Sequence, residues 1–148
     1  MIYYSAADEK WSKSLAYIDS FLQTKAHQNA RRMGIGLLKA CILNYEGKDK
    51  KARAALEDYE GLIRDPWFLT ISEYLLGKKT DKALKDQAGE SPERLITAYT
   101  MMGFWDEGAG EPKKAARHYK EAMGSFLDDW LEYDFARERI MRLKKPAE

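Results

Sequence analysis

Valine is absent from this 148-residue chain, which is instead rich in alanine, leucine, glutamate and lysine. Because β-branched residues favour strands and the residues that dominate here favour helices, the composition predicts an all-α fold. It also argues against a parallel β-sheet, and so against the usual nucleotide-binding enzymes built on such sheets. Glycine and proline are sparse, at 10 and 4 residues, so the composition is globular rather than disordered or fibrous.

Cysteine and histidine are also scarce, since Cys41, His27 and His118 are the only ones. A single cysteine excludes an internal disulfide, and no His/Cys cluster has the spacing of a zinc site, so we expect no metal and no cofactor. Cys41 follows Ala40 and precedes Ile42, which favours a buried small hydrophobic residue. The alternative is a nucleophile with His27 or His118 as its base, but no local signature supports it.

Charge of either sign is not in excess, because 25 Lys+Arg face 24 Asp+Glu, for a net charge of +1. We therefore expect no binding of nucleic acid. No apolar run approaches the roughly 20 residues that span a bilayer, so no membrane span is expected. The start, Met1-Ile2-Tyr3-Tyr4, does not read as a signal peptide, which favours a cytoplasmic protein. If a signal has been removed, the protein would be periplasmic or associated with the outer membrane.

Apolar residues recur at helical spacing along most of the chain, and glycine and proline separate these segments. Pro66 and Ser91-Pro92 suit the first turn of a helix, while Gly47 suits a left-handed cap. Nothing resembles a linker, so a single domain over residues 1–148 is expected. The pattern predicts about eight helices, near residues 8–24, 28–45, 49–63, 67–76, 80–87, 92–107, 112–123 and 128–144.

An internal repeat lies within these helices. A small residue, a glycine, an alanine and a large apolar residue occur in the same order twice, 63 residues apart. The small residue lets two antiparallel helices approach closely, the glycine makes the turn, and the large residue fills the space between hairpins. Such hairpins stack because one alone cannot bury its apolar face. The two sets are Ala40, Gly47, Ala52, Leu56 and Gly103, Gly110, Ala115, Tyr119.

This pattern resembles the tetratricopeptide repeat (TPR) family. In the best unit, residues 96–129, the family's aromatic, small and large positions are occupied by Tyr99, Gly103, Ala115, Tyr119 and Ala122. The unit departs from the family at Asp106, where tyrosine is favoured, and at Leu127, where proline is usual. Residues 73–77, 93–99, 115–122 and 130–137 are also similar to the carboxy-terminal part of bacterial TPR lipoproteins of the NlpI type.

The resemblance implies a superhelix of antiparallel hairpins, with units near residues 8–32, 33–66, 67–90 and 96–127 and a capping helix at 128–144. It also implies a non-enzymatic scaffold or adaptor that binds another protein or peptide. In stacked TPR hairpins the first helix of each pair lines a concave groove, where aromatic area and asparagine amides suit a peptide. The residues predicted for this groove are Leu37, Asn44, Tyr45, Thr97, Thr100, Phe104 and Glu107, with Cys41 on the same face.

Three alternatives remain open at this point. Leu37, Cys41 and Phe104 would simply pack against neighbouring helices if the groove is filled. Tyr3, Tyr4 and Trp11 have no obvious partner in a first hairpin, which favours a homodimer, as in a self-associating structural subunit of a bacterial envelope or secretion assembly. A helical enzyme that uses scattered carboxylates is the third alternative. Its adjacent pair Asp128-Asp129 reads better as the start of a helix.

Overall fold

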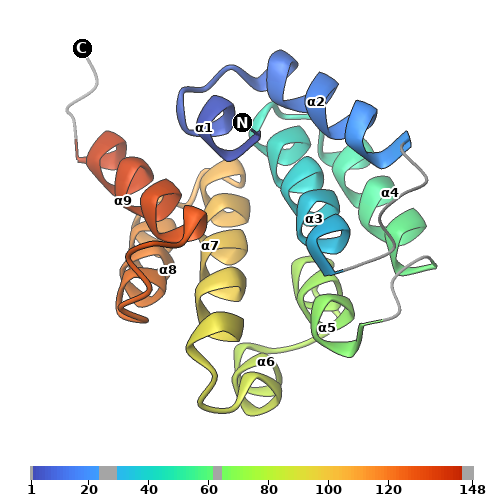
Figure 1. Cartoon of the computed structure of the whole chain (residues 1–148). Coiled ribbons are helices and arrows are strands. Elements are labelled where there is room, and N and C mark those ends of the chain that lie inside the picture. Colours follow the sequence, from blue (N-terminus) through green and yellow to red (C-terminus); the bar gives the residue numbers. More distant parts are fainter. Residues whose placement is uncertain (1, 24–29, 62–64, 145–148) are drawn as a thin grey trace.

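The computed structural model describes residues 2–23, 30–61 and 65–144, and within these ranges the chain is all-α, with no strand. The expected segments all form helices, and one further short helix, α1, precedes them (Figure 1). The helices are α1 Ile2–Ala7, α2 Trp11–Gln23, α3 Ala30–Tyr45, α4 Asp49–Glu60, α5 Pro66–Leu75, α6 Asp81–Ala88, α7 Pro92–Gly108, α8 Pro112–Met123 and α9 Leu131–Leu143.

Most helix ends follow the local signals in the sequence. Pro66 and Pro92 occupy the first turns of α5 and α7, and the Ser91 hydroxyl accepts a hydrogen bond from the Arg94 backbone N–H at 3.3 Å. Gly47 and Gly110, with φ of 72° and 75°, make the left-handed turns of the two hairpins that the repeat predicts. Local chemistry thus accounts for where these helices begin and turn.

The capping helix is shorter than expected. We predicted that it begins at Asp128, but α9 begins at Leu131, after an extended Trp130 with φ −88° and ψ 141°. Asp128 and Asp129 lie in the turn before it, so they do not form its first turn. The acidic residues in the first turn of α9 are Glu132 and Asp134, which meet the positive end of the helix dipole in their place.

The α3–α4 and α7–α8 pairs are antiparallel hairpins with close helix contacts. A Cβ atom at Gly103 would lie 2.7 Å from the Tyr119 ring, so this ring lies against the backbone of α7. Only glycine allows that approach. The alanines and the large apolar residues of the two repeated sets lie in the interior, since Ala40, Ala52, Leu56, Ala115 and Tyr119 are fully buried, while Gly47 and Gly110 are exposed in the turns.

The two hairpins exchange a large and a small residue at one equivalent contact. In α7–α8 the pair 23 residues apart is Tyr99 and Ala122, with the large side chain on the first helix. In α3–α4 the corresponding pair is Gly36 and Tyr59, and a Cβ at Gly36 would lie 2.2 Å from the Tyr59 ring. The space between the two helices is thus filled by a tyrosine of the first helix in α7–α8 and by a tyrosine of the second helix in α3–α4. This exchange explains how Tyr59 is accommodated where the family pattern has alanine.

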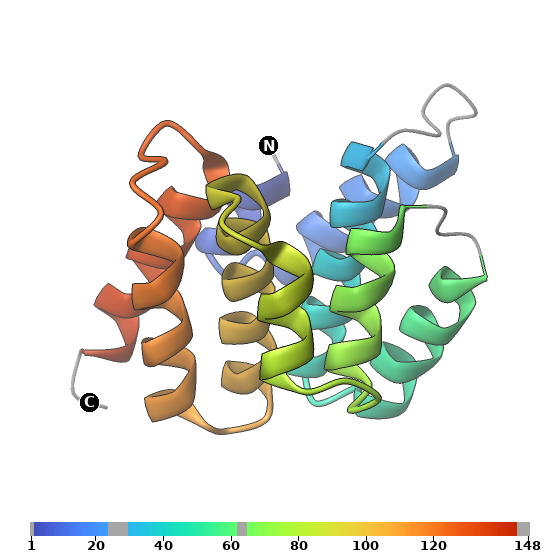
Figure 2. The same ribbon diagram turned by 90° about the horizontal axis from the view of Figure 1, so that it is seen from below.

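Helix α3 packs directly against α7. Cys41 Sγ donates to the Met101 carbonyl at 3.6 Å, and Asn44 Nδ2 donates to the Trp105 carbonyl at 2.9 Å, so the two helices run side by side in the same direction. Helix α5 contacts both α3 and α7, and α6 contacts α7, but neither separates the two, and Figure 2, seen from below, places α5 and α6 in front. This differs from the regular stack that we expected, in which the unit 67–90 would lie between the other two.

The first two helices and the last one close over this pair. The Trp11 ring lies 4.9 Å from Tyr45 and 5.5 Å from Phe104, and the Tyr3 ring lies 6.0 Å from Phe135 of α9. Tyr3 and Trp11 therefore have partners within their own chain, which removes the sequence argument for a homodimer at these two residues. The side chain of Tyr4 lies outside the described part. None of the described helices is long and apolar enough to cross a membrane.

Candidate functional site

The side chains predicted to line a concave groove lie mostly in the interior. Leu37 and Phe104 are fully buried, Asn44, Thr97 and Thr100 are nearly so, and the side chain of Glu107 is 8% exposed. Tyr45 is half-buried. The physical reason is the direct packing of α3 on α7, with Trp11 closing over Tyr45 and Phe104. The surface that a regular stack would offer to a partner is thus occupied by the chain itself.

The polar members of this set are satisfied inside the protein. Asn44 donates to the Trp105 carbonyl, Thr97 Oγ1 donates to the Glu93 carbonyl at 3.2 Å, and Thr100 Oγ1 donates to the Glu132 carbonyl at 3.5 Å. Buried polar groups need such partners, because an unpaired one costs free energy. Asn44 therefore connects α3 to α7 and Thr100 connects α7 to α9, while the bond of Thr97 stays within α7. Their polarity, which suggested a binding surface, serves contacts between helices.

A buried ion pair lies at the centre of these contacts. Arg139 of α9 is 1% exposed and makes a bidentate interaction with Glu107 of α7, in which Arg139 Nε donates to Glu107 Oε2 at 3.1 Å. The Tyr119 hydroxyl donates to the same carboxylate at 2.8 Å, and Arg139 Nη1 donates to Glu9 Oε1 at 2.8 Å. One guanidinium therefore ties together α7, α9 and the turn between α1 and α2.

Three aromatic rings surround this guanidinium. Its centre lies 5.6 Å from the Trp11 ring, 5.0 Å from Tyr45 and 5.9 Å from Phe104, distances typical of cation–π contact. Burial lowers the pKa of Arg139, but the hydrogen bonds to Glu107 and the charge of Glu107 raise it by more than burial lowers it. The side chain therefore stays cationic. The aromatic residues that resembled a peptide-binding surface thus hold an arginine of the same chain.

A second polar cluster joins α7 and α8. Asp106 accepts from Lys114 Nζ at 2.9 Å, and its other carboxylate oxygen lies 2.6 Å from His118 Nδ1. Asp106 and His118 are both buried. A histidine–carboxylate pair is a common acid–base device. Here the pair lies inside the hairpin and closes the contact where the TPR pattern would place a tyrosine, so its geometry is that of a structural bridge.

Cys41 lies in the same interior. Burial raises the pKa of its thiol, the charge of Asp106 adds to the effect, and its Sγ donates to the Met101 carbonyl. A neutral, buried thiol is a poor nucleophile. His118 is bonded to Asp106, and His27 lies outside the described residues. Within the described ranges, no group of three or more His, Cys, Asp or Glu side chains could hold a metal ion.

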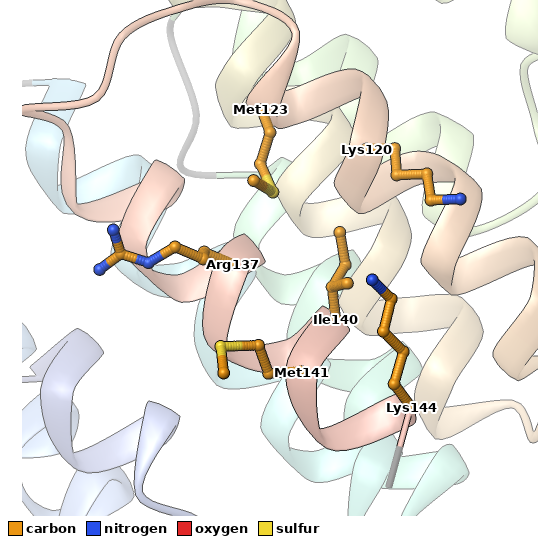
Figure 3. A pocket seen from close by; sticks show the side chains of 6 residues that line it. All are labelled: Lys120, Met123, Arg137, Ile140, Met141 and Lys144. Atoms are coloured by element: carbon orange, nitrogen blue, oxygen red, sulfur yellow. The ribbon is translucent and has the colours of Figure 1, made fainter.

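An accessible groove lies between α8 and α9 in the described part of the chain. It consists of two adjoining hollows of about 360 and 350 Å³, and Figure 3 shows the first. Because residues early in α8 meet residues late in α9, the two helices run antiparallel along it. We call this surface the α8–α9 groove. Its first hollow is lined by Lys120, Met123, Arg137, Ile140, Met141 and Lys144, and the second adds Pro112, Lys113, Ala116 and Leu143.

The α8–α9 groove has an apolar floor and a basic rim. Met123, Ile140 and Met141 lie between Arg137 on one side and Lys120 and Lys144 on the other (Figure 3).

The same hairpin carries exposed apolar side chains. The large hydrophobic residues that are exposed in the described part of the chain are Phe126 at 87%, Leu131 at 41% and Met141 at 55%. All three belong to α9 or to the loop before it. Of the three, Met141 lines the α8–α9 groove, while Phe126 and Leu131 line neither hollow.

Sequence reasoning missed this groove because it looked for a site on the first helices of the hairpins. A signal was present in the spacing, since Pro112, Ala116, Lys120 and Met123 recur every three or four residues and share one face of α8. Arg137, Ile140, Met141 and Lys144 form a matching stripe on α9. Each stripe mixes apolar and basic residues, and only their adjacency distinguishes them from an ordinary solvated face.

Comparison with profiles of known protein families, with curated sequences and with solved structures found no match for this chain.

Proposed function

We propose that this chain is a non-enzymatic protein-interaction module, and that it binds a segment of a partner protein in the α8–α9 groove. The observation that carries the proposal is the apolar floor of the α8–α9 groove, which is formed by Met123, Ile140 and Met141, with Met141 55% exposed. When a partner covers exposed apolar side chains, the free energy falls by about 25 cal/mol for each Å² of apolar surface removed from water. A contact of this kind suits a scaffold or adaptor.

The rest of the molecule acts as a rigid support for this surface. The buried ion pair between Arg139 and Glu107 fixes α9 on α7, and the contact between Asp106 and His118 fixes α8 on α7. The two helices that form the groove are thus both anchored to the same central helix. A preformed groove loses less conformational entropy on binding than a flexible one.

We also propose that the architecture derives from TPR-like hairpins. The close approach of Gly103 to Tyr119 and the left-handed turns at Gly47 and Gly110 support this proposal. In this chain, however, the working surface is the outer groove of the last hairpin, because the α3–α7 contact fills the inner one. The placement of the site therefore differs from the one that the TPR resemblance implies.

A peptide-display selection tests the proposed function. A library of random peptides of about 14 residues, long enough for about four helical turns, is selected on the full chain. The peptides recovered are then measured by fluorescence polarisation against Ala116→Gln/Met141→Ser, which obstructs the groove without changing charge. We expect this variant to lose about tenfold or more in affinity, because it removes apolar contact. The matched control is Ala54→Gln, at an exposed site on α4.

Equal affinity of the selected peptides for the wild type and the groove variant would reject the proposal. Light scattering coupled to size exclusion addresses the alternative of a self-associating subunit, in which a second copy covers the same surface. A dimer that dissociates in Ala116→Gln/Met141→Ser would assign the groove to a second copy and would also reject the proposed partner. A monomer at high concentration leaves the surface free for a different protein.

A further inference from the structure

We infer that the partner segment for the α8–α9 groove is an acidic amphipathic helix, with apolar residues on one face and Asp or Glu at the edges of that face. The inference rests on the proposed function and adds the chemistry of the partner. It follows from the charge of the rim, the shape of the groove and the position of the acidic residues nearby.

The rim of the groove is basic and largely uncompensated. Lys113, Lys120 and Lys144 are exposed and form no ion pair with any described carboxylate, while Arg137 pairs with Asp134 at 2.8 Å. Elsewhere in the described chain seven lysines form ion pairs, while Lys13, Lys50, Lys51 and Lys85 form none, so the groove is distinguished by having three unpaired lysines together rather than by unpaired charge as such. The paired lysines are Lys10, Lys39, Lys48, Lys78, Lys79, Lys82 and Lys114.

No acidic residue lines either hollow of the groove. Glu121 directly follows Lys120, but adjacent residues point about 100° apart on a helix, and Glu121 lines neither hollow. Lys114 lies on the other flank of α8, where it pairs with Asp106 and Glu111. Apart from Arg137, which pairs with Asp134, the positive charge of the groove is therefore not neutralised by its own helices. A partner with carboxylates near Lys113, Lys120 and Lys144 would gain contacts with them.

The shape of the groove favours a helix as its occupant. Two antiparallel helices packed side by side leave a furrow along their axes into which the side-chain ridge of a third helix fits. From Pro112 to Met123 the α8 side of the furrow extends about 16 Å, which is about three helical turns. A helix of this length would place apolar residues at i, i+3 or i+4 and i+7 on Met123, Ile140 and Met141. Carboxylates flanking that stripe would reach Lys120 and Lys144.

The peptides recovered from the display selection also test this inference, through their composition. We expect groove-dependent peptides to be rich in Asp and Glu on either side of an apolar stripe, and to gain helicity by circular dichroism when they bind. For the best of these peptides, replacing the acidic residues by Gln should lower the affinity about tenfold. Raising the salt concentration from 50 to 500 mM should lower the affinity of the unchanged peptide by a similar factor.

Charge reversal on the protein provides a matched pair of variants. Lys120→Glu/Lys144→Glu should lower the affinity for the acidic peptide about tenfold or more, because electrostatic attraction is replaced by repulsion. The control is Lys50→Glu/Lys51→Glu on α4, whose two lysines are also exposed and form no described ion pair but line neither hollow. This control has the same net charge as the test variant, so it should bind the peptide with nearly wild-type affinity.

The results separate this inference from the proposed function. Groove-dependent peptides that are neutral or basic, or that bind equally well to Lys120→Glu/Lys144→Glu, would overturn the acidic partner while the groove itself stands. Peptides that bind Ala116→Gln/Met141→Ser as tightly as the wild type would overturn the assignment of the site to the groove, and the acidic partner with it. Acidic, groove-dependent peptides that lose affinity in the Lys120→Glu/Lys144→Glu variant but not in the Lys50→Glu/Lys51→Glu control would support both.

Discussion

Arg139 and Glu107 form a bidentate ion pair in the interior of the protein, although they lie 32 residues apart on α9 and α7. The pair is supported by the Tyr119 hydroxyl on the carboxylate and by three aromatic rings around the guanidinium. Both charges have been removed from water, so each depends on the other. The orientation of α9, and hence of the groove it shares with α8, depends on this contact.

Removing one partner of the pair should be strongly destabilising. For Arg139→Met we expect the free energy of unfolding to fall by about 3–5 kcal/mol, because the Glu107 carboxylate stays buried without its cation. The double variant Glu107→Leu/Arg139→Met should be more stable than Arg139→Met alone, since it leaves no unpaired charge. Urea denaturation followed by circular dichroism measures both. A loss below about 1 kcal/mol for Arg139→Met would show that water reaches the pair.

The α3–α7 contact can be tested at Gly108. A Cβ there would lie 2.7 Å from the Tyr45 backbone nitrogen and 2.6 Å from Asn44 Nδ2, so Gly108→Ala should force the two helices apart. We expect it to lower the free energy of unfolding by about 1–3 kcal/mol, despite the better helix propensity of alanine. The control is Gly34→Ala on α3, whose Cβ would lie 3.5 Å from the Phe68 ring.

Because 3.5 Å is an ordinary contact distance, Gly34→Ala should leave stability unchanged or raise it by up to about 1 kcal/mol. Thermal melts of the two variants compare the sites directly. If Gly108→Ala melts as high as Gly34→Ala, α3 and α7 are not in backbone contact. The regular stack, with the unit 67–90 between them, would then be the better description.

Phe104 distinguishes a core residue from a binding residue. Its ring is fully buried and lies 5.1 Å from Phe135, 5.5 Å from Trp11 and 5.7 Å from Tyr45. Phe104→Ala should lower the free energy of unfolding by about 3–5 kcal/mol, through lost burial and the cavity left behind. Phe126→Ala, at a ring that is 87% exposed, should change it by no more than about 0.5 kcal/mol. Similar small effects for both would place Phe104 on an open surface.

The stability of the protein should carry a pH dependence from Glu132. Burial raises the pKa of this carboxyl above its ordinary value of 4.5, more than the hydrogen bonds it accepts lower it. The folded state therefore binds more protons than the unfolded state between 4.5 and the raised pKa. Because of this linkage, the free energy of unfolding falls as the pH rises through that window. The native state is favoured at the acidic end, where Glu132 is protonated.

The variant Glu132→Gln removes this contribution. It keeps a neutral side chain of the same shape, so its stability relative to the wild type should increase as the pH rises from about 4 to 7. Urea denaturation at several pH values measures the difference between the two proteins. A constant difference across this range would show that the pKa of Glu132 is not raised. The sign would be opposite for a carboxylate that a salt bridge stabilises.

Much of the secondary structure follows from local signals that the sequence displays openly. The absence of valine, the apolar spacing, and residues such as Ser91, Pro92 and Gly110 act within one or two turns of helix, so they can be recognised without knowing the fold. The start of α9 was misplaced because Asp128 and Asp129 resemble a helix start. The preference of the loop for an extended Trp130 has no such local signature.

The predicted groove could not be placed correctly by the same reasoning. Asn44, Phe104 and Glu107 have side chains that suit either a peptide-binding surface or a polar contact between helices. Which of these occurs depends on whether α3 and α7 touch, and that contact joins residues 60 or more apart in sequence. Arg139 was not singled out in the sequence, because nothing nearby in sequence identifies its partner Glu107.

The sequence by itself determined that the chain is helical, where most helices begin and end, and that the hairpins close on small residues such as Gly103. These features depend on backbone propensities and on contacts within one hairpin, which act over short distances along the chain. Only the tertiary structure decided that the residues predicted for the inner groove are buried and that a groove forms between α8 and α9. That choice depends on burial and on ion pairing between helices that are distant in sequence. Whether a charged or aromatic residue stabilises or destabilises the fold depends on whether its surroundings provide a partner for it.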